Sequence, residues 1–172
     1  PILTNSQFKK FKKFFSKKVK VIDCTFNIEE SLKERIELIR EEAETAVREG
    51  STCLILSDKN ITNQKASIPS ILTVGAVHSH LVKHGLRGYC SLNVECSDAM
   101  DTHSFAILIG VGATTVNPYL AIDSIYQRFE KKLFGKSDFE TCVNKFKKSI
   151  DAGLLKIMSK MGISVISSYR GG

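Results

Sequence analysis

The chain has 172 residues, 42% of them hydrophobic, which is enough to bury one sizeable core, so we expect a single domain. No apolar run reaches the roughly 18 residues that a bilayer span needs, and the first residues lack the pattern of a signal peptide. We therefore expect a cytoplasmic protein that does not contact membranes. The sequence begins at Pro1 without an initiator methionine and ends directly after an apolar run, so we also expect it to be part of a longer polypeptide.

The formal net charge of +7 comes entirely from one end of the sequence. Residues 1–20 hold seven of the 25 basic residues and no acidic residue, so the remaining 18 basic residues balance the 18 acidic ones. No motif that reads a nucleic-acid groove accompanies this basic segment. We therefore predict no nucleic-acid partner.

The cysteines indicate a reducing environment. There are five of them, an odd number, and none are paired in a C-x-x-C spacing. Cys24 and Cys53 lie in apolar, strand-like runs, where a free thiol behaves as a small hydrophobic side chain. This pattern favours reduced thiols over a disulfide framework.

The first predicted element is an amphipathic helix over residues 6–18, where four phenylalanines recur at helical spacing with lysines between them. Such a helix could bind an anionic membrane surface or a polyanion. Alternatively, its phenylalanines pack on the protein's own core, which is the commoner use of such a stripe. We adopt the second interpretation, with residues 1–18 as a basic helix packed on a single α/β domain of residues 19–172.

The segment of residues 19–26 is short and rich in β-branched residues, which predicts a buried strand. Asn27, with Glu30 three residues later, resembles a capping box and predicts the start of a long helix that ends near Gly50. A second buried strand is expected over residues 52–57.

The second half of the sequence continues the alternation of strands and helices. A polar stretch leads to Pro69, which suits a first helical turn. The expected elements are then a helix at 70–84, a strand at 90–96, a strand or helix at 102–109, a strand at 114–116, a helix at 119–134, a helix from Asp138 interrupted at Gly153 and resumed over 154–161, and a final strand at 163–168.

Alternation of strands and helices at this spacing predicts βαβ units and hence a parallel sheet flanked by helices. About four such units are too few for a closed eight-stranded barrel, which needs about 250 residues. We therefore predict an α/β fold of parallel βα units that form an open sheet or a rudimentary half of a TIM-like barrel.

Three histidines form the densest group of chemically versatile side chains. His80 and His84 are four residues apart, so they share a helix face and could bind a metal together, whereas His78 points elsewhere. No acidic residue within this helix supplies a third ligand. Cys90, Cys96 and His103 would have to be brought close by the fold, so we assign no metal ligand and interpret the histidines as structural or surface residues.

Two further patterns were considered as sites. Gly110 and Gly112 lack the spacing of phosphate-binding loops, so we interpret them as turn glycines between a helix and a strand. Asp23 and Asp58 each end a predicted strand and are expected at the carboxyl edge of the sheet, where α/β proteins bind ligands. Neither has an evident His or Lys partner in the sequence, so we assign no catalytic residue and no cofactor-binding residue.

Three long motifs resemble the second half of the central domain of glutamate synthases. They are GAVHSHLVKHGLR (75–87), HSFAILIGVGATTVNPYLA (103–121) and GLLKIMSKMGISVISSYRGG (153–172), and PILTN (1–5) and LSD (56–58) fit as well. The sequence departs from the family at Met100, where a basic residue is usual, and at Ser104, where a second histidine is usual.

The resemblance implies a parent enzyme that makes glutamate from glutamine and 2-oxoglutarate. In the family, a glutaminase domain releases ammonia, which travels through a tunnel to an FMN-binding barrel. Electrons reach the FMN through a 3Fe-4S cluster, from an NAD(P)H-oxidising subunit or from ferredoxin. The central domain connects the glutaminase and FMN-binding domains and resembles a rudimentary barrel.

None of the family's catalytic or cofactor motifs lies in this sequence, so we expect a structural connecting domain that is inactive by itself. Two alternatives remain. The first is a free-standing anion-binding α/β module that uses the Lys/Phe segment on nucleic acid or lipid, and the second is a small metal-dependent enzyme built on His80 and His84.

Overall fold

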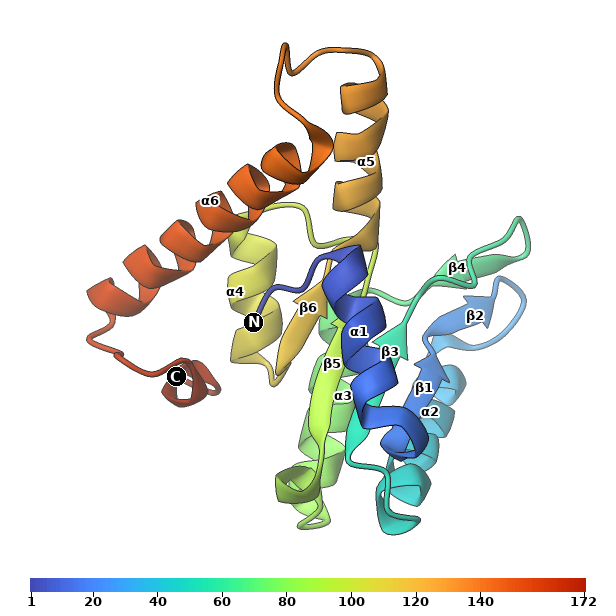
Figure 1. Ribbon diagram of the computed structural model, residues 1–172. Helices are drawn as coiled ribbons and strands as arrows, with labels where there is room; N and C mark the ends of the chain where they lie inside the picture. The colour runs from blue at the N-terminus through green and yellow to red at the C-terminus, as the bar shows by residue number, and fades with distance from the viewer.

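The computed structural model describes residues 1–172, and its centre is a four-stranded parallel sheet (Figure 1). The strand order is β1-β3-β5-β6. The strands are β1 (Val19–Asp23), β3 (Cys53–Ser57), β5 (Ser91–Glu95) and β6 (Thr115–Asn117). The sheet is open and does not close into a barrel, so the predicted α/β fold of parallel βα units is confirmed.

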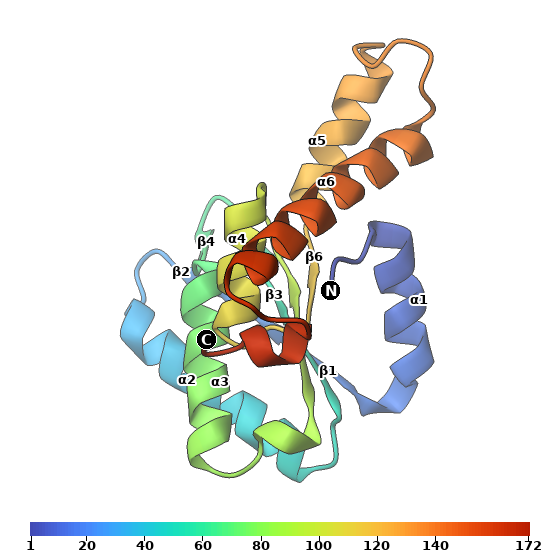
Figure 2. The ribbon, with the colours of Figure 1, turned by 90° about the vertical axis from the view of Figure 1, so that its left-hand side faces the viewer.

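Helices cover both faces of the sheet unequally (Figures 1 and 2). The helices α2 (Leu32–Arg48), α3 (Ser70–Lys83) and α4 (Thr102–Gly110) lie on one face, and α1 (Asn5–Phe15) lies alone on the other. Side chains alternate along β3, so Leu54 and Leu56 join the main core under α2–α4, while Cys53 and Ile55 pack against Phe8 of α1. All five residues of β3 are therefore buried.

The first three residues extend the sheet beyond β6. Ile2 forms a parallel bridge with Val116, whose N–H donates to the carbonyl of Pro1 at 2.8 Å. Thr4 then caps α1 in a capping box with Gln7. The predicted amphipathic helix over 6–18 is thus an α-helix that ends at Phe15 and continues as the short 3₁₀ turn η1 (Ser16–Lys18).

A small antiparallel ribbon corrects two of the sequence-based expectations. The predicted strand over 19–26 is two strands, because the chain leaves the sheet at Cys24 and β2 (Thr25–Asn27) pairs with β4 (Lys65–Ser67). The polar stretch after β3 therefore contains a strand that was not predicted. Its stabilising partner lies about forty residues away in the sequence, so no local pattern reveals it.

The helix after β2 starts later than predicted. Glu30 does accept a hydrogen bond from the backbone N–H of Asn27, at 3.2 Å, but this is not a helix cap. Asn27 is held in extended geometry by its pairing with Lys65, so the helix begins at Leu32 with Ser31 as its N-cap.

The segment over 102–109, for which the sequence left strand and helix open, is helical. Asp101 caps it by accepting a hydrogen bond from the backbone N–H of Ser104.

Two further helices, α5 (Tyr119–Glu130) and α6 (Phe139–Lys160), form a hairpin that projects away from the sheet (Figures 1 and 2). The predicted helix over 119–134 thus ends four residues early. None of the helices combines the length and hydropathy that crossing a bilayer demands.

Two expectations near the end of the sequence are wrong. The helix α6 continues through Gly153, which meets α4 rather than breaking the helix. Residues 163–168 form no strand but lead into the 3₁₀ turn η3 (Ile166–Tyr169). The outer edge of β6 is not open to such a strand, because Ile2 already pairs with Val116 there. A third short 3₁₀ turn, η2 (Arg87–Tyr89), precedes β5.

Gly153 and Gly75 provide a matched test of the helix packing. A Cβ atom on Gly153 would lie 2.6 Å from the side chain of Thr102, whereas a Cβ on Gly75 would meet nothing within 4 Å. We expect Gly153→Ala to lower the free energy of unfolding by about 1–3 kcal/mol through overpacking. Gly75→Ala should raise it by about 0.5–1 kcal/mol, because alanine restricts the unfolded chain.

Urea denaturation of both variants measures these changes. Equal effects of the same sign at both positions would contradict the close packing of α4 on α6.

Candidate functional site

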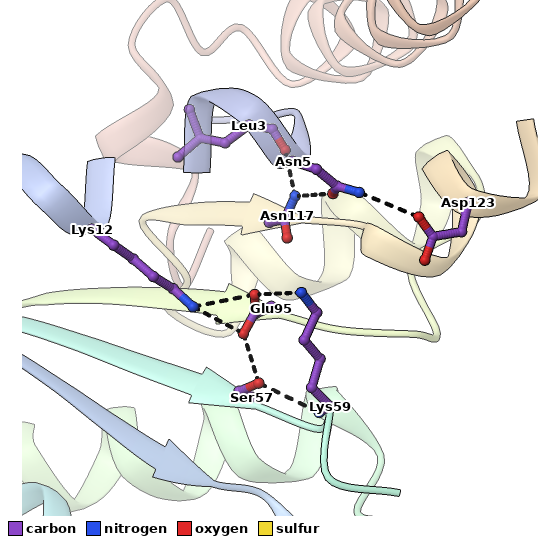
Figure 3. Close-up of polar contacts among 8 residues, drawn as sticks. All are labelled: Leu3, Asn5, Lys12, Ser57, Lys59, Glu95, Asn117 and Asp123. Carbon is purple, nitrogen blue, oxygen red and sulfur yellow. Dashed lines mark hydrogen bonds and ion pairs between the residues drawn. The ribbon is translucent and has the colours of Figure 1, made fainter. Parts of the chain in front are cut away.

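Four polar residues stand in one row where the strands of the sheet end. The strand register aligns Asp23 with Ser57, Ser57 with Glu95, and Glu95 with Asn117. The carboxyl edge of a parallel sheet is where α/β proteins usually bind ligands. This row is therefore the candidate site, and Figure 3 shows Ser57, Glu95 and Asn117 of it.

Glu95 lies at the centre of the row, and only 5% of its side chain is exposed. The hydroxyl of Ser57 donates to Oε2 at 2.8 Å. The ammonium of Lys12 lies 3.3 Å from both carboxylate oxygens, and that of Lys59 lies 3.0 Å from Oε1 (Figure 3). We call Lys12, Ser57, Lys59 and Glu95 the Glu95 clamp, because they join α1, β3, the loop after β3, and β5.

The charges of the clamp are balanced so that Glu95 stays ionised. Burial by itself raises the pKa of Glu95, but the hydrogen bonds from Ser57 and Lys59 and the charges of the two lysines outweigh it and lower the pKa. The lysine ammoniums also lie over aromatic rings, Lys12 at 4.8 Å from the ring centre of Phe8 and Lys59 at 5.0 Å from that of Tyr119. A carboxylate held in this way is a weak proton acceptor, so the clamp is suited to joining elements.

Asn117 attaches the beginning of the chain to the same edge (Figure 3). Its side-chain amide donates to the carbonyl of Leu3 and to Oδ1 of Asn5, both at 2.9 Å. The amide of Asn5 in turn donates to Asp123 of α5 at 3.4 Å. Together with the Glu95 clamp, these bonds attach α1 to the sheet near its start and near its end.

The structure places Asp23 and Asp58 at the carboxyl edge, as predicted, but the two serve separate loops. Asp23 accepts hydrogen bonds from Thr25 and Asn60. Asp58 accepts from the backbone N–H and the hydroxyl of Ser97, at 2.9 and 2.6 Å. Each aspartate therefore holds a turn beside the sheet.

The three histidines divide between two places, as their spacing predicts. Nδ1 of His78 accepts from Nε of Arg87 at 3.1 Å. Burial and the charge of Arg87 lower the pKa of His78, which favours the neutral ring that this bond requires. Arg87 also donates to the carbonyls of Cys90 and Gly112.

Gly112 is a turn glycine, as the sequence predicts, and two features of the structure require glycine at this position. Its φ of +128° is unfavourable for other residues, and a Cβ atom there would lie 2.4 Å from the ring of His78. Gly110 lies in α4, and its carbonyl accepts from the N–H of Gly171 at 2.9 Å. The three motifs singled out in the sequence therefore pack against one another in the structure.

The structure brings an unexpected carboxylate to the other two histidines. Oε2 of Glu44, on α2, lies 2.6 Å from Nε2 of His80 and 3.8 Å from Nδ1 of His84. Glu44 lies 36 residues before His80 in the sequence, so the pattern of a single helix does not reveal it. The sequence does contain one indirect signal. If β1 and β3 are neighbouring strands, the helices that follow them, α2 and α3, should lie side by side.

The remaining candidates stay apart from this group. Cys90 and Cys96 are buried, and burial raises the pKa of both thiols. Ser104 donates its hydroxyl to Oδ1 of Asp101 at 2.7 Å, so one departure from the family pattern takes part in a helix cap. Met100, the other departure, is half exposed.

Replacing the central carboxylate tests the Glu95 clamp. We expect Glu95→Gln to lower the free energy of unfolding at pH 7 by about 1–3 kcal/mol, at the lower end for a buried ion pair because both lysines are partly exposed. Because the pKa of Glu95 is lowered in the folded state, this contribution is present above the ordinary glutamate pKa of about 4.3 and is lost as the pH falls through the lower folded value.

Urea titrations from pH 7 down to pH 3 follow the difference between the wild type and Glu95→Gln. The exposed Glu41→Gln on α2 is the control, for which we expect little change at any pH. A difference for Glu95→Gln that does not shrink below about pH 4.3 would contradict the clamp.

Comparison with known proteins agrees with the resemblance found in the sequence. The family described as the glutamate synthase central domain matches residues 1–172. The NADPH glutamate synthase large chain of Azospirillum brasilense is 50% identical over 100% of this chain, and that of Bacillus subtilis is 41% identical over 99%. The NADH glutamate synthase of Schizosaccharomyces pombe is 39% identical over 99%. These matches cover 12%, 11% and 8% of the relatives, respectively, so the chain spans about a tenth of their length. The chain therefore belongs to the glutamate synthase central domain family.

Proposed function

We propose that this chain is the structural connecting part of a glutamate synthase, joining its glutaminase domain to its FMN-binding domain. The parent enzyme makes glutamate from glutamine and 2-oxoglutarate. The family match over the whole chain and the names of the relatives support this assignment. The electron donor stays open between an NAD(P)H-oxidising subunit and ferredoxin, because the relatives include NADPH, NADH and ferredoxin-dependent forms.

The observation that carries the proposal is the Glu95 clamp. It fills the sheet edge where a ligand would otherwise bind, and its carboxylate is bonded to groups of the chain itself. A connecting domain has to be rigid, because displacements near 1 Å at a reacting centre can cost on the order of a hundredfold in rate. The clamp stiffens the domain by fixing α1 on the sheet.

The residues of this chain do not fit the cofactors of the family. A 3Fe-4S cluster needs thiolates, but the five cysteines are buried, and burial raises the pKa of Cys24 to about 12. At the carboxyl edge of the sheet, Lys12 and Lys59 are already bonded to Glu95, so this edge offers no free cation for the phosphate of FMN. We therefore place both cofactors elsewhere in the parent enzyme. The buried free thiols also support a reducing, cytoplasmic setting.

The hairpin of α5 and α6 supports a connecting role. It projects from the sheet (Figures 1 and 2) and carries large apolar side chains that are more than 60% exposed, namely Leu133 and Leu155. In our proposal, neighbouring domains of the same polypeptide cover them.

In the same proposal, the chain consists of an N-terminal helix and one α/β domain. Residues 1–18 act as a basic helix packed on the α/β domain of residues 19–172. The burial of Phe8 against Cys53 and Ile55 supports this division.

Loosening the clamp in the complete enzyme tests the connecting role. We expect Glu95→Ala in a full-length large chain to lower glutamine-dependent glutamate formation roughly tenfold to a hundredfold. Glutaminase activity and ammonia-dependent glutamate formation, measured separately, should each change much less. Glu41→Ala, on the exposed face of α2, is the matched control.

A selective loss of one partial reaction, with FMN content and the circular dichroism spectrum unchanged, would contradict the connecting role. That outcome would place Glu95 in the chemistry.

A second candidate function is anion binding by α1, and the exposure of its side chains favours it. Five lysines of residues 9–18 point to solvent, and Phe14 is 82% exposed. If this surface binds nucleic acid or anionic lipid, the affinity of the chain for DNA or phosphatidylserine vesicles should fall steeply between 50 and 200 mM salt, a range in which six to ten phosphate contacts lose about 10³–10⁵ in affinity. The connecting role instead predicts weak binding with a shallow salt dependence.

A further inference from the structure

We propose that Glu44, His80 and His84 form a binding site for a divalent transition metal ion, with zinc as the preferred ion. One carboxylate oxygen and two imidazole nitrogens are a ligand set that zinc accepts readily, and three protein ligands leave a fourth position for water. The site is separate from the Glu95 clamp and does not depend on the proposed connecting role.

The donor atoms are already close enough together. The potential ligand atoms of the three side chains all lie within 4.8 Å of one another. Oε2 of Glu44 is 2.6 Å from Nε2 of His80 and 3.8 Å from Nδ1 of His84. Tetrahedral zinc with bonds of about 2.0–2.2 Å needs donors about 3.4 Å apart. To reach that geometry, Glu44 and His80 must move slightly apart and the ring of His84 must turn so that its Nε2 faces them, because Nδ1 bonds to the carbonyl of His80. Rotation of the side chains supplies both movements.

The helix spacing fixes the two histidines on one face. His80 and His84 are four residues apart at the end of α3, and their ring centres lie 4.2 Å apart. Glu44 occupies the facing side of α2, which packs along α3. The ligands therefore come from two helices held by the main core, and not from flexible loops.

Neighbouring groups already orient the ligands. Nδ1 of His84 lies 2.8 Å from the carbonyl of His80, so it donates its proton there and leaves the lone pair of Nε2 free. Arg48 bonds to Oε1 of Glu44 at 2.8 Å through its Nε, which leaves Oε2 to face the histidines. Backbone carbonyls and charged side chains commonly support metal ligands in this way.

The ends of two helices favour a cation at this place. Glu44 lies near the end of α2, and the histidines lie in the last turn and at the cap of α3, so the negative ends of two helix dipoles converge here.

An ion can reach the site from solvent. The side chains of His80, Glu44 and His84 are 19%, 21% and 35% exposed. All five cysteines are buried, so the folded chain offers no accessible thiolate that would compete for zinc. When zinc binds, it displaces the proton shared between His80 and Glu44 and links α2 to α3 directly.

Isothermal titration calorimetry with zinc chloride in a non-chelating buffer at pH 7.5 tests the proposal. We expect one zinc ion per chain, no comparable binding of magnesium, and a rise in Tm of roughly 5–10 °C at a hundredfold excess over Kd. Glu44→Gln, His80→Gln and His84→Gln should each weaken zinc binding at least about tenfold. Glu41→Gln and His103→Gln, which remove the same groups at exposed positions elsewhere, should bind zinc like the wild type.

Circular dichroism confirms that each variant is folded, and His84→Gln changes an exposed side chain that the core does not need. Absence of zinc binding to the folded wild type, or equal affinity in the wild type and His84→Gln, would overturn the site. Unchanged affinity in Glu44→Gln would overturn the role of the carboxylate that α2 provides.

Discussion

The arrangement of the domain depends on one buried carboxylate between two lysines. Glu95 ends the third strand of the sheet, and Lys12 and Lys59 reach it from α1 and from the loop after β3. An unpaired carboxylate at this depth would cost several kcal/mol, so the lysines must be present for the edge to close. The consequence is that α1, an isolated helix on its face of the sheet, is held in a fixed position by a contact at the carboxyl edge.

A second set of contacts joins the three motifs that resemble the family. His78 and Arg87 from the first motif surround Gly112 of the second, and Gly171 of the third bonds to Gly110. These residues fix how α3, α4 and the end of the chain pack, and they lie away from the carboxyl edge. These residues of the family motifs therefore act in packing, which is consistent with the connecting role proposed above.

The sequence predicted the fold class well because alternating β-branched and amphipathic segments are local signals. It also placed Asp23 and Asp58 at the correct edge, since each follows a buried strand. It failed where a distant partner decides the outcome: β4 needs β2, the apparent last strand loses its edge to Ile2, and Gly153 fits against Thr102. The Glu95 clamp and the grouping of Glu44 with two histidines were missed for the same reason, because tertiary structure alone brings these residues together.

The most direct test of this account is hydrogen–deuterium exchange of the backbone amides of α1. A free helix of 11 residues is marginal in water, so strong protection requires that the sheet and the clamp hold it. The account predicts that amides of α1 are protected to within about tenfold of those in α2, and that Glu95→Gln removes this protection selectively. Exchange of α1 at the rate of an unstructured peptide, with α2–α4 still protected, would contradict it.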